Sequence, residues 1–213
     1  MVVAVAAHKI AYMPVPKSAC SSVKAALLQI DPAHPSTVDM DVVHDVFPTR
    51  RFHQKNWRDY DDWWRFTVVR DPLRRLLSVY TDRVVNRREL FHSRRLRKQT
   101  ALPRDPDPDF FFQNLQAYRR LSSSIKHHAL PVHLFVGPKP LPYDQVFRVD
   151  QLSDLVGALA QRSGTTPDMP RLNRSGAKLS LDSLHPQTQD ALAQELKPEY
   201  DHLRGFFSNP FAD

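Results

Sequence analysis

Short apolar runs alternate with segments of helical periodicity in the first part of the chain. The run His8–Val15 is apolar and ends in prolines, which predicts a buried strand whose last residues leave the sheet. Between Val23 and Ile30 the apolar residues fall at i, i+3, i+4 and i+7, the spacing of one helix face. This spacing predicts an amphipathic helix over Ser18–Ile30 that ends at Asp31-Pro32. The segment therefore indicates a strand, a tight turn and a helix.

The same arrangement recurs at Arg65–Val84. The β-branched run Phe66–Arg70 predicts a strand, and Asp71-Pro72 has the residue types favoured at a helix N-cap and first helical position. The helix that follows presents one apolar stripe, formed by Leu73, Leu76, Leu77, Tyr80 and Val84. Two such units predict an α/β fold with a mostly parallel central sheet flanked by helices, in which ligands bind beyond the carboxyl ends of the strands.

The remaining chain has weaker patterns. Residues Asn86–Asp109 are first basic and then acidic and proline-rich, and we interpret them as a mobile surface excursion. Further elements are expected as helices at Phe110–Leu121, Gln151–Arg162 and Pro186–Leu203 and as strands at Pro131–Gly137 and Tyr143–Val149. A polar loop is expected over Gly164–Ser183.

Composition narrows the class of protein. With 213 residues, 41% apolar and 25% charged, the chain is expected to form one globular domain over residues 1–213. The single cysteine, Cys20, excludes an internal disulfide, and no targeting or membrane-spanning segment is visible, so we expect a cytoplasmic protein. The Arg and Ala content is typical of a high-GC bacterial source. A net charge of +7 attracts anionic partners without indicating a reaction.

The segment Pro16–Ser22 has the parts of a phosphate cradle. It joins the first strand to a helix N-terminus, where backbone N–H groups and the helix dipole favour an anion. Lys17 adds a positive charge, and Ser21 and Ser22 add hydroxyl donors. The glycines of a nucleoside triphosphatase loop, G-x-x-x-x-G-K-[ST], are absent. Asp71 is better suited to capping a helix than to binding magnesium, so the pattern favours an anion site without a metal.

A second anion site is expected near the end of the second strand. Arg70 and Ser78 could face one crevice and provide a guanidinium and a hydroxyl for another phosphate. Taken singly, a lysine near a helix start is usually solvated, and an Arg-Asp pair is often only a surface ion pair. The combination of both motifs, each after a short apolar strand, favours the functional interpretation.

These motifs resemble those of a known family. Met13–Leu27 (MPVPKSACSSVKAAL) resembles the 5′-phosphosulfate loop of sulfotransferases, in the style of the Golgi carbohydrate sulfotransferases and their bacterial relatives. Phe66–Arg83 resembles their 3′-phosphate motif, and Tyr143–Val156 and Arg171–Gly176 resemble the C-terminal part of the family. The similarity therefore covers most of the chain except Asn86–Asp109.

The resemblance implies a P-loop-like, three-layer α/β fold that binds 3′-phosphoadenosine 5′-phosphosulfate (PAPS) and releases PAP. The residues it assigns to the 5′-phosphosulfate are Lys17, Ser18, Ala19, Cys20, Ser21 and Ser22. Arg70 and Ser78 are assigned to the 3′-phosphate, and Arg174 and Ser175 to a loop that covers the cofactor. The implied acceptor is a hydroxyl of a small molecule, a glycan or a glycolipid, with a carbohydrate or glycolipid favoured.

Sulfuryl transfer also needs a cation at the leaving oxygen and a base for the acceptor hydroxyl. Lys17 is the expected cation. The resemblance implies a base in the region after the first helix, where His44 is our choice and His53 and Asp45 compete with it. His44 as an ordinary hydrogen-bonded structural residue remains open.

Other reactive side chains have weaker patterns. The Cys20 thiol has no histidine paired with it by spacing, so its side chain is not expected to be essential. His127, His128 and His133 match no metal-ligand motif. The aromatic cluster of Trp57, Tyr60, Trp63 and Trp64 is interpreted as core packing, with a wall for adenine or a sugar as the alternative.

Two other classes of function compete with sulfuryl transfer. A nucleotide kinase or triphosphatase with a degenerate loop is disfavoured by the missing glycines. A basic nucleic-acid-binding module fits the charge, but no zinc finger or RNA-binding motif occurs, so no nucleic-acid partner is expected. The basic run Arg87–Lys98 could steer an acidic or polar acceptor or form an ordinary charged surface. The oligomeric state stays open.

Overall fold

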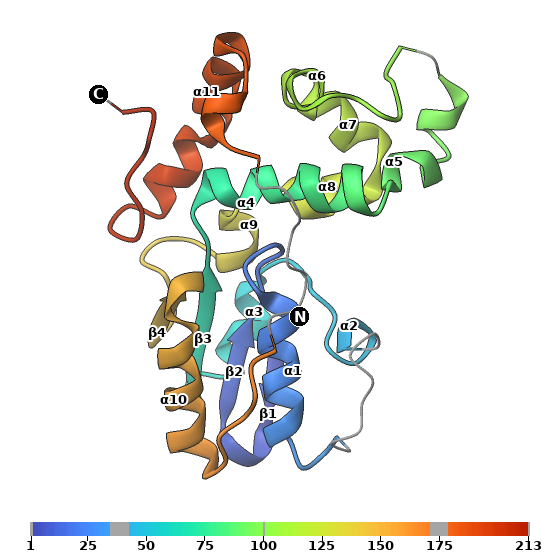
Figure 1. Cartoon of the computed structure of the whole chain (residues 1–213). Helices are drawn as coiled ribbons and strands as arrows, with labels where there is room; N and C mark the ends of the chain where they lie inside the picture. The colour runs from blue at the N-terminus through green and yellow to red at the C-terminus, as the bar shows by residue number, and fades with distance from the viewer. Residues whose placement is uncertain (1, 35–42, 100, 171–178, 213) are drawn as a thin grey trace. The chain divides into compact units, whose positions relative to one another are not determined.

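The structure is a computed structural model that describes residues 2–34, 43–99, 101–170 and 179–212 (Figure 1). It divides the chain into two compact units, each with its own hydrophobic core. Unit 1 comprises residues 1–70 and 132–174, and unit 2 comprises residues 71–131 and 175–213. The boundary falls directly after Arg70. The first predicted strand–helix motif therefore lies wholly in unit 1, whereas the strand of the second motif lies in unit 1 and its helix in unit 2.

Unit 1 is built on a four-stranded sheet in the order β1-β2-β3-β4. The strands are β1 (Val3–Val5), β2 (Ile10–Met13), β3 (Trp64–Val69) and β4 (Gln145–Arg148). β2, β3 and β4 are parallel, which confirms the predicted mostly parallel α/β fold. The antiparallel edge strand β1 was not predicted. It turns into β2 through the short 3-10 helix η1 (Ala6–His8) and Lys9, whose left-handed backbone (φ 48°) allows the reversal.

Both faces of this sheet are covered. Ile10 and Tyr12 of β2 pack with α1 (Cys20–Ile30) and α10 (Leu152–Ser163), which lie over one face of the sheet in Figure 1. The alternate residues of β2 pack on the other face with Trp57 of α3 (Gln54–Arg58). Strands that are buried on both faces read as continuous apolar runs, as β2 does. The predicted three-layer arrangement of helices around the sheet is therefore confirmed.

Smaller elements complete unit 1, namely α2 (Val43–Val46), α9 (His133–Val136) and η5 (Val149–Gln151). The strand predicted at Pro131–Gly137 was wrong, because this segment forms α9. Short apolar runs do not distinguish a buried strand from a buried helical turn. Here the Phe135 and Val136 amides donate to the Val132 carbonyl, and Gly137, at φ 83°, ends the turn.

Unit 2 is helical. Its elements are α4 (Pro72–Val79), the π-helical segment η3 (Tyr80–Asn86), α5 (Glu89–His92), η4 (Leu96–Lys98), α6 (Pro108–Gln113), α7 (Leu115–Leu121), α8 (Ser123–Ala129), η6 (Leu181–Ser183) and α11 (Pro186–His202). Asp71 caps α4 by accepting from the Arg74 amide at 2.8 Å, and Pro72 opens the helix, as predicted. The predicted apolar stripe from Leu73 to Val84 is buried in the core of unit 2.

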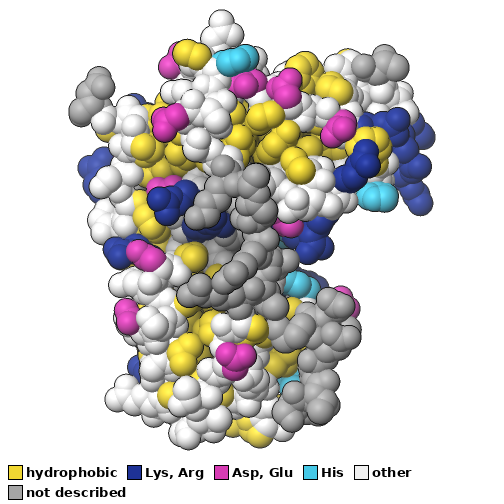
Figure 2. Space-filling model, in the orientation of Figure 1, with side chains coloured by type: hydrophobic (Ala, Val, Ile, Leu, Met, Phe, Trp, Pro, Cys, Tyr) yellow, Lys and Arg dark blue, Asp and Glu magenta, His cyan; other side chains and the backbone are white. Residues whose placement is uncertain are grey.

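Two predictions for unit 2 need correction. The segment Asn86–Asp109, predicted as a mobile surface excursion, contains the short helices α5 and η4, and Leu90 and Leu96 are buried in the core. The predicted helix Phe110–Leu121 is broken at Asn114, whose side-chain amide donates to the Phe110 carbonyl at 2.9 Å. The basic residues of the segment remain at the surface, and dark-blue side chains gather over α5 in Figure 2.

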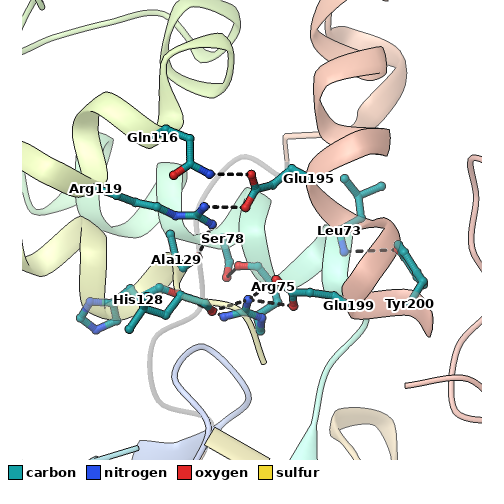
Figure 3. A network of polar contacts seen from close by, with 11 residues as sticks. Leu73, Arg75, Ser78, Gln116, Arg119, His128, Ala129, Glu195, Glu199 and Tyr200 are labelled. Carbon is teal, nitrogen blue, oxygen red and sulfur yellow. Dashed lines mark hydrogen bonds and ion pairs between the residues drawn. The ribbon is translucent and has the colours of Figure 1, made fainter. Parts of the chain in front are cut away.

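A buried ion pair joins the helices of unit 2 (Figure 3). The fully buried Arg75 of α4 donates to both carboxylate oxygens of Glu199 on α11, each at 2.9 Å. It also donates to the carbonyls of His128 (3.2 Å) and Leu130 (3.0 Å). Beside this pair, Arg119 of α7 donates to Glu195 of α11 and to the Ala129 carbonyl. The network therefore ties α4, α7, α8 and α11 together.

Candidate functional site

The loop between β2 and α1 bends sharply without glycine. Lys17 (φ 66°) and Ala19 (φ 59°) both have left-handed backbone, which is uncommon for residues with a Cβ. Each such residue costs roughly 1–2 kcal/mol. Strain of this kind concentrates at ligand-binding loops, where the surrounding structure enforces it. The loop therefore has the curvature of a phosphate-binding loop although it lacks the glycines.

The start of α1 is suited to an anion. The N-cap residue is Ala19, which has no side-chain acceptor for the first-turn N–H groups. The Ser18 hydroxyl is fully buried and has no hydrogen-bond partner among the described residues. An unpaired buried hydroxyl costs about 1–3 kcal/mol, which an anionic ligand at this loop would offset. The donors of this loop thus fit an anionic group.

Arg70 contacts the same loop between β2 and α1. It directly follows β3, and its Nη1 donates to the Lys17 carbonyl at 3.2 Å. β2 and β3 are parallel neighbours, so the segments that follow them emerge at the same edge of the sheet. Two residues predicted for opposite ends of the cofactor, Lys17 and Arg70, are thereby brought together in unit 1.

His44 of α2 also contacts this site. Its Nε2 lies 2.7 Å from the Ser21 Oγ, in the first turn of α1. All three candidate bases are exposed: His44 and Asp45 on α2, and His53 before α3. Of the three candidate bases, His44 is the one that contacts Ser21 and Lys24 among the described residues.

Sequence reasoning missed Lys24 and Thr49. Lys24 lies on α1 and its side chain is fully buried, with Nζ donating to the Thr49 Oγ1 at 2.6 Å and lying 3.1 Å from the His44 Nδ1. Burial lowers the pKa of the Lys24 amine to about 8, although the nearby Cys20 acts in the opposite direction. The only sequence signal was a lysine inside the apolar run Val23–Leu28. Thr49, Lys24, His44 and Ser21 form a continuous polar chain.

The model of the sulfotransferase family matches residues 2–202. This chain belongs to the sulfotransferase family. Membership of this family makes the protein a transferase of sulfuryl groups. Because the match extends over most of both units, the family domain of this sulfotransferase includes the helical unit as well as the sheet. No curated protein and no solved structure matched the chain. The described part of this sulfotransferase contains no helix long and apolar enough to cross a bilayer.

Three further predicted site residues of the sulfotransferase are Ser78, Arg174 and Ser175. Ser78 is in unit 2, where its buried hydroxyl donates to the Arg75 carbonyl at 2.7 Å. Arg174 and Ser175 lie outside the described residues. Among the described residues, no group of three or more His, Cys, Asp or Glu side chains is placed to hold a metal ion.

The aromatic cluster lies mainly in the packing of unit 1. Trp57 is buried, and its indole N–H donates to the Pro142 carbonyl at 2.8 Å. Trp63 and Tyr60 pack beside it, while Trp64 packs with the core on the other face of the sheet. These contacts account for the cluster as part of the core.

Proposed function

We propose that this sulfotransferase moves the sulfuryl group of PAPS to a hydroxyl group of a carbohydrate or glycolipid, by in-line displacement. The observation that carries the proposal is the joining of Lys17 and Arg70 at one sheet edge, next to the buried Ser18 hydroxyl. When bound, PAPS supplies an activated sulfuryl group on an anionic leaving group. Two cations and a strained loop provide complementary charge and donors for such a ligand.

Each residue of the loop has a proposed role. The Lys17 ammonium stabilises the negative charge that develops on the leaving oxygen. The hydroxyls and backbone N–H groups that hold the phosphosulfate belong to Ser18, Ala19, Cys20, Ser21 and Ser22. Arg70 and Ser78 are proposed for the 3′-phosphate, and Arg174 and Ser175 for the covering loop. One guanidinium carries five N–H donors, so the bond from Arg70 to the loop is compatible with a phosphate contact.

His44 is proposed as the general base. A base must lie within hydrogen-bond reach of the acceptor hydroxyl, and the Ser21 contact holds the His44 ring at the start of α1. The base then takes the hydroxyl proton as the acceptor oxygen attacks.

A metal is not part of this proposal. The carboxylate that follows β3, Asp71, accepts hydrogen bonds from the Arg74 amide at 2.8 Å and from the Tyr200 hydroxyl at 3.0 Å. Both contacts hold Asp71 as the cap of α4, a role that differs from the magnesium ligand of a nucleoside triphosphatase.

Charge supports an acidic acceptor. The segment Arg87–Lys98 has six Arg and Lys against one Glu, a net charge of +5 out of +7 for the whole chain. These basic residues are exposed on unit 2. A concentrated field of this kind raises the association rate of polyanions, and the effect falls with ionic strength. An acidic glycan or glycolipid therefore fits better than a neutral phenol.

Calorimetric titration of PAP and of ADP, each with and without Mg²⁺, tests the donor. We expect PAP to bind more tightly than ADP and its affinity to be independent of magnesium. A magnesium-dependent preference for ADP would instead support a nucleotide kinase or triphosphatase. A screen of hydroxyl compounds for sulfate uptake from PAPS then identifies the acceptor class.

A further inference from the structure

Both ring nitrogens of His44 are engaged within unit 1. Nε2 lies 2.7 Å from the Ser21 Oγ, and Nδ1 lies 3.1 Å from the Nζ of Lys24. We propose that Lys24 is a positioning residue whose own protonation state decides which nitrogen of His44 carries the proton. This inference rests on the proposed function, because it takes His44 as the base.

A charged Lys24 makes His44 unable to act through Nε2. An ammonium group has three donors and no acceptor. It therefore donates to the His44 Nδ1, and the neutral ring must carry its proton on Nε2. Nε2 then donates to the Ser21 Oγ and has no lone pair for the proton of an acceptor hydroxyl.

A neutral Lys24 reverses this pattern. The amine lone pair accepts from an Nδ1–H group, and the lone pair of Nε2 then faces Ser21 and the acceptor. When the acceptor oxygen attacks, its O–H bond breaks and an N–H bond forms at Nε2. The Nδ1 proton passes to the Lys24 nitrogen, so the histidine ends neutral and the lysine ends as ammonium. Thr49 accepts a hydrogen bond from the lysine nitrogen in either state and keeps it in place.

The surroundings of Lys24 make the neutral amine accessible. The titratable groups brought to it by the described residues are Cys20 on its own helix and His44 on α2. β1, which also packs against α1, has only Val3, Ala4 and Val5. Among the described residues no carboxylate pairs with the amine. Full burial without a counter-charge disfavours the ammonium form.

The first test reads the His44 tautomer by ¹⁵N NMR of histidine-labelled protein, with the His44 signal identified by its loss in His44→Asn. In the wild type we expect the neutral ring to be Nε2–H at about pH 7 and Nδ1–H at about pH 9.5, either side of the altered lysine titration. Lys24→Arg, which cannot lose its charge, should keep the Nε2–H ring throughout. The same tautomer at both pH values in the wild type would overturn the inference.

The second test is the pH dependence of kcat. In the wild type kcat should rise through about pH 8. Lys24→Arg should lower kcat by about 10²-fold or more across the range, because base catalysis is worth about 10²–10⁴-fold. Lys24→Met should lose the alkaline rise, since no amine remains to titrate. The matched controls Lys9→Met and Lys9→Arg change an exposed lysine paired with Asp62 and should keep the wild-type profile.

Melting temperature and PAP binding check that each variant folds. If Lys24→Arg does not fold, Lys24→Met decides, and an unchanged alkaline rise in that variant overturns the inference. The two proposals can fail separately. A pH-dependent tautomer in a protein that does not use PAPS would refute only the proposed function, whereas turnover with PAPS and a fixed tautomer would refute only the role of Lys24.

Discussion

Among the described residues, Lys24 of unit 1 and Arg75 of unit 2 are both fully buried cations, and they have different partners. In unit 2, Arg75 meets a carboxylate, Glu199, in a two-pronged contact and donates to two backbone carbonyls. In unit 1, the described partners of Lys24 are a threonine hydroxyl and a histidine ring, and neither is a carboxylate. The Arg75 charge therefore has a buried counter-charge, whereas the charge of Lys24 has none among the described residues.

The difference separates a structural role from a chemical one. A buried ion pair fixes the positions of helices, because separating its partners would leave an uncompensated buried charge. A buried lysine without a counter-charge changes its protonation within the working range and can exchange a proton with its neighbour. Burial of a charged side chain alone therefore does not identify a functional residue, and the nature of its partner does.

The largest expected effect is a loss of stability when the buried ion pair between Arg75 and Glu199 is broken. Glu199→Ala leaves the Arg75 guanidinium buried without its counter-charge and should lower the free energy of unfolding by about 3–5 kcal/mol. The matched control on the same helix is Asp201→Ala, which removes an exposed ion pair with Arg204 and should cost about 0.5 kcal/mol or less. Urea unfolding measures both. Equal costs for the two variants would remove the distinction between the buried and the exposed pair.

A third cation, Lys17, is half-buried in the strained loop. Its substitution tests whether this charge contributes to catalysis. Lys17→Met should lower kcat by about 10²–10³-fold, because a fixed cation at the leaving oxygen is lost. Stability should change little, since no core contact is removed. Lys55→Met, at an exposed position on α3, is the control and should leave kcat at the wild-type value. Initial rates with PAPS provide the measurement, and a decrease of less than threefold in Lys17→Met would contradict the assignment.

The titration of Lys24 should also make the free energy of unfolding depend on pH. The pKa of this amine is lowered from 10.5 to about 8 in the folded protein. Between these values the unfolded chain holds a proton that the folded protein has released, so stability rises with pH across this window. The wild type should therefore gain roughly 3 kcal/mol relative to Lys24→Met as the pH rises through the window.

Unfolding in urea at a series of pH values measures this difference. Burial raises the pKa values of Tyr12 and Tyr143 well above 10.0, so stability falls again as the unfolded tyrosines ionise. That loss is common to wild type and variant and cancels when the two curves are subtracted. A flat difference curve would show that Lys24 has an ordinary titration.

The smallest effect is expected at Cys20. Its proposed contribution is a backbone N–H at the start of α1, which serine retains, so Cys20→Ser should change kcat by only about twofold, or 0.5 kcal/mol. Steady-state kinetics with PAPS measure the change. Loss of turnover with PAP binding preserved would mean that the thiol itself takes part.

Periodicity in the sequence predicted the longer elements well. α1, α4, α10 and α11 follow apolar spacing or helix-start residues, and their observed bounds lie within two residues of the prediction or, at the end of α4, continue as a π-helical segment. α9 was missed because a helix of four residues, His133–Val136, is too short to show a distinguishing period. The division into units was not predicted because the core of unit 2 joins residues 71–131 to α11, through contacts that no local pattern records.

The candidate site was predictable where one short segment holds it. Lys17, Ser18 and Ser21 follow a strand directly, and Arg70 ends the next strand, so their meeting follows from parallel pairing. Lys24 was not predictable, because its burial depends on α2 and Thr49, which are distant in the sequence. A lysine in an isolated helical pattern is expected to be solvated.

The backbone at Lys17 and Ala19 sets limits on which amino acids these positions accept. With positive φ at both, a side chain branched at Cβ would clash with its own main chain, so valine, isoleucine and threonine are excluded whatever their polarity. Glycine and asparagine fit the same geometry without that conflict. A saturation library at Ala19 should consequently sort its survivors by the shape of the side chain at the branch point and hardly at all by hydrophobicity.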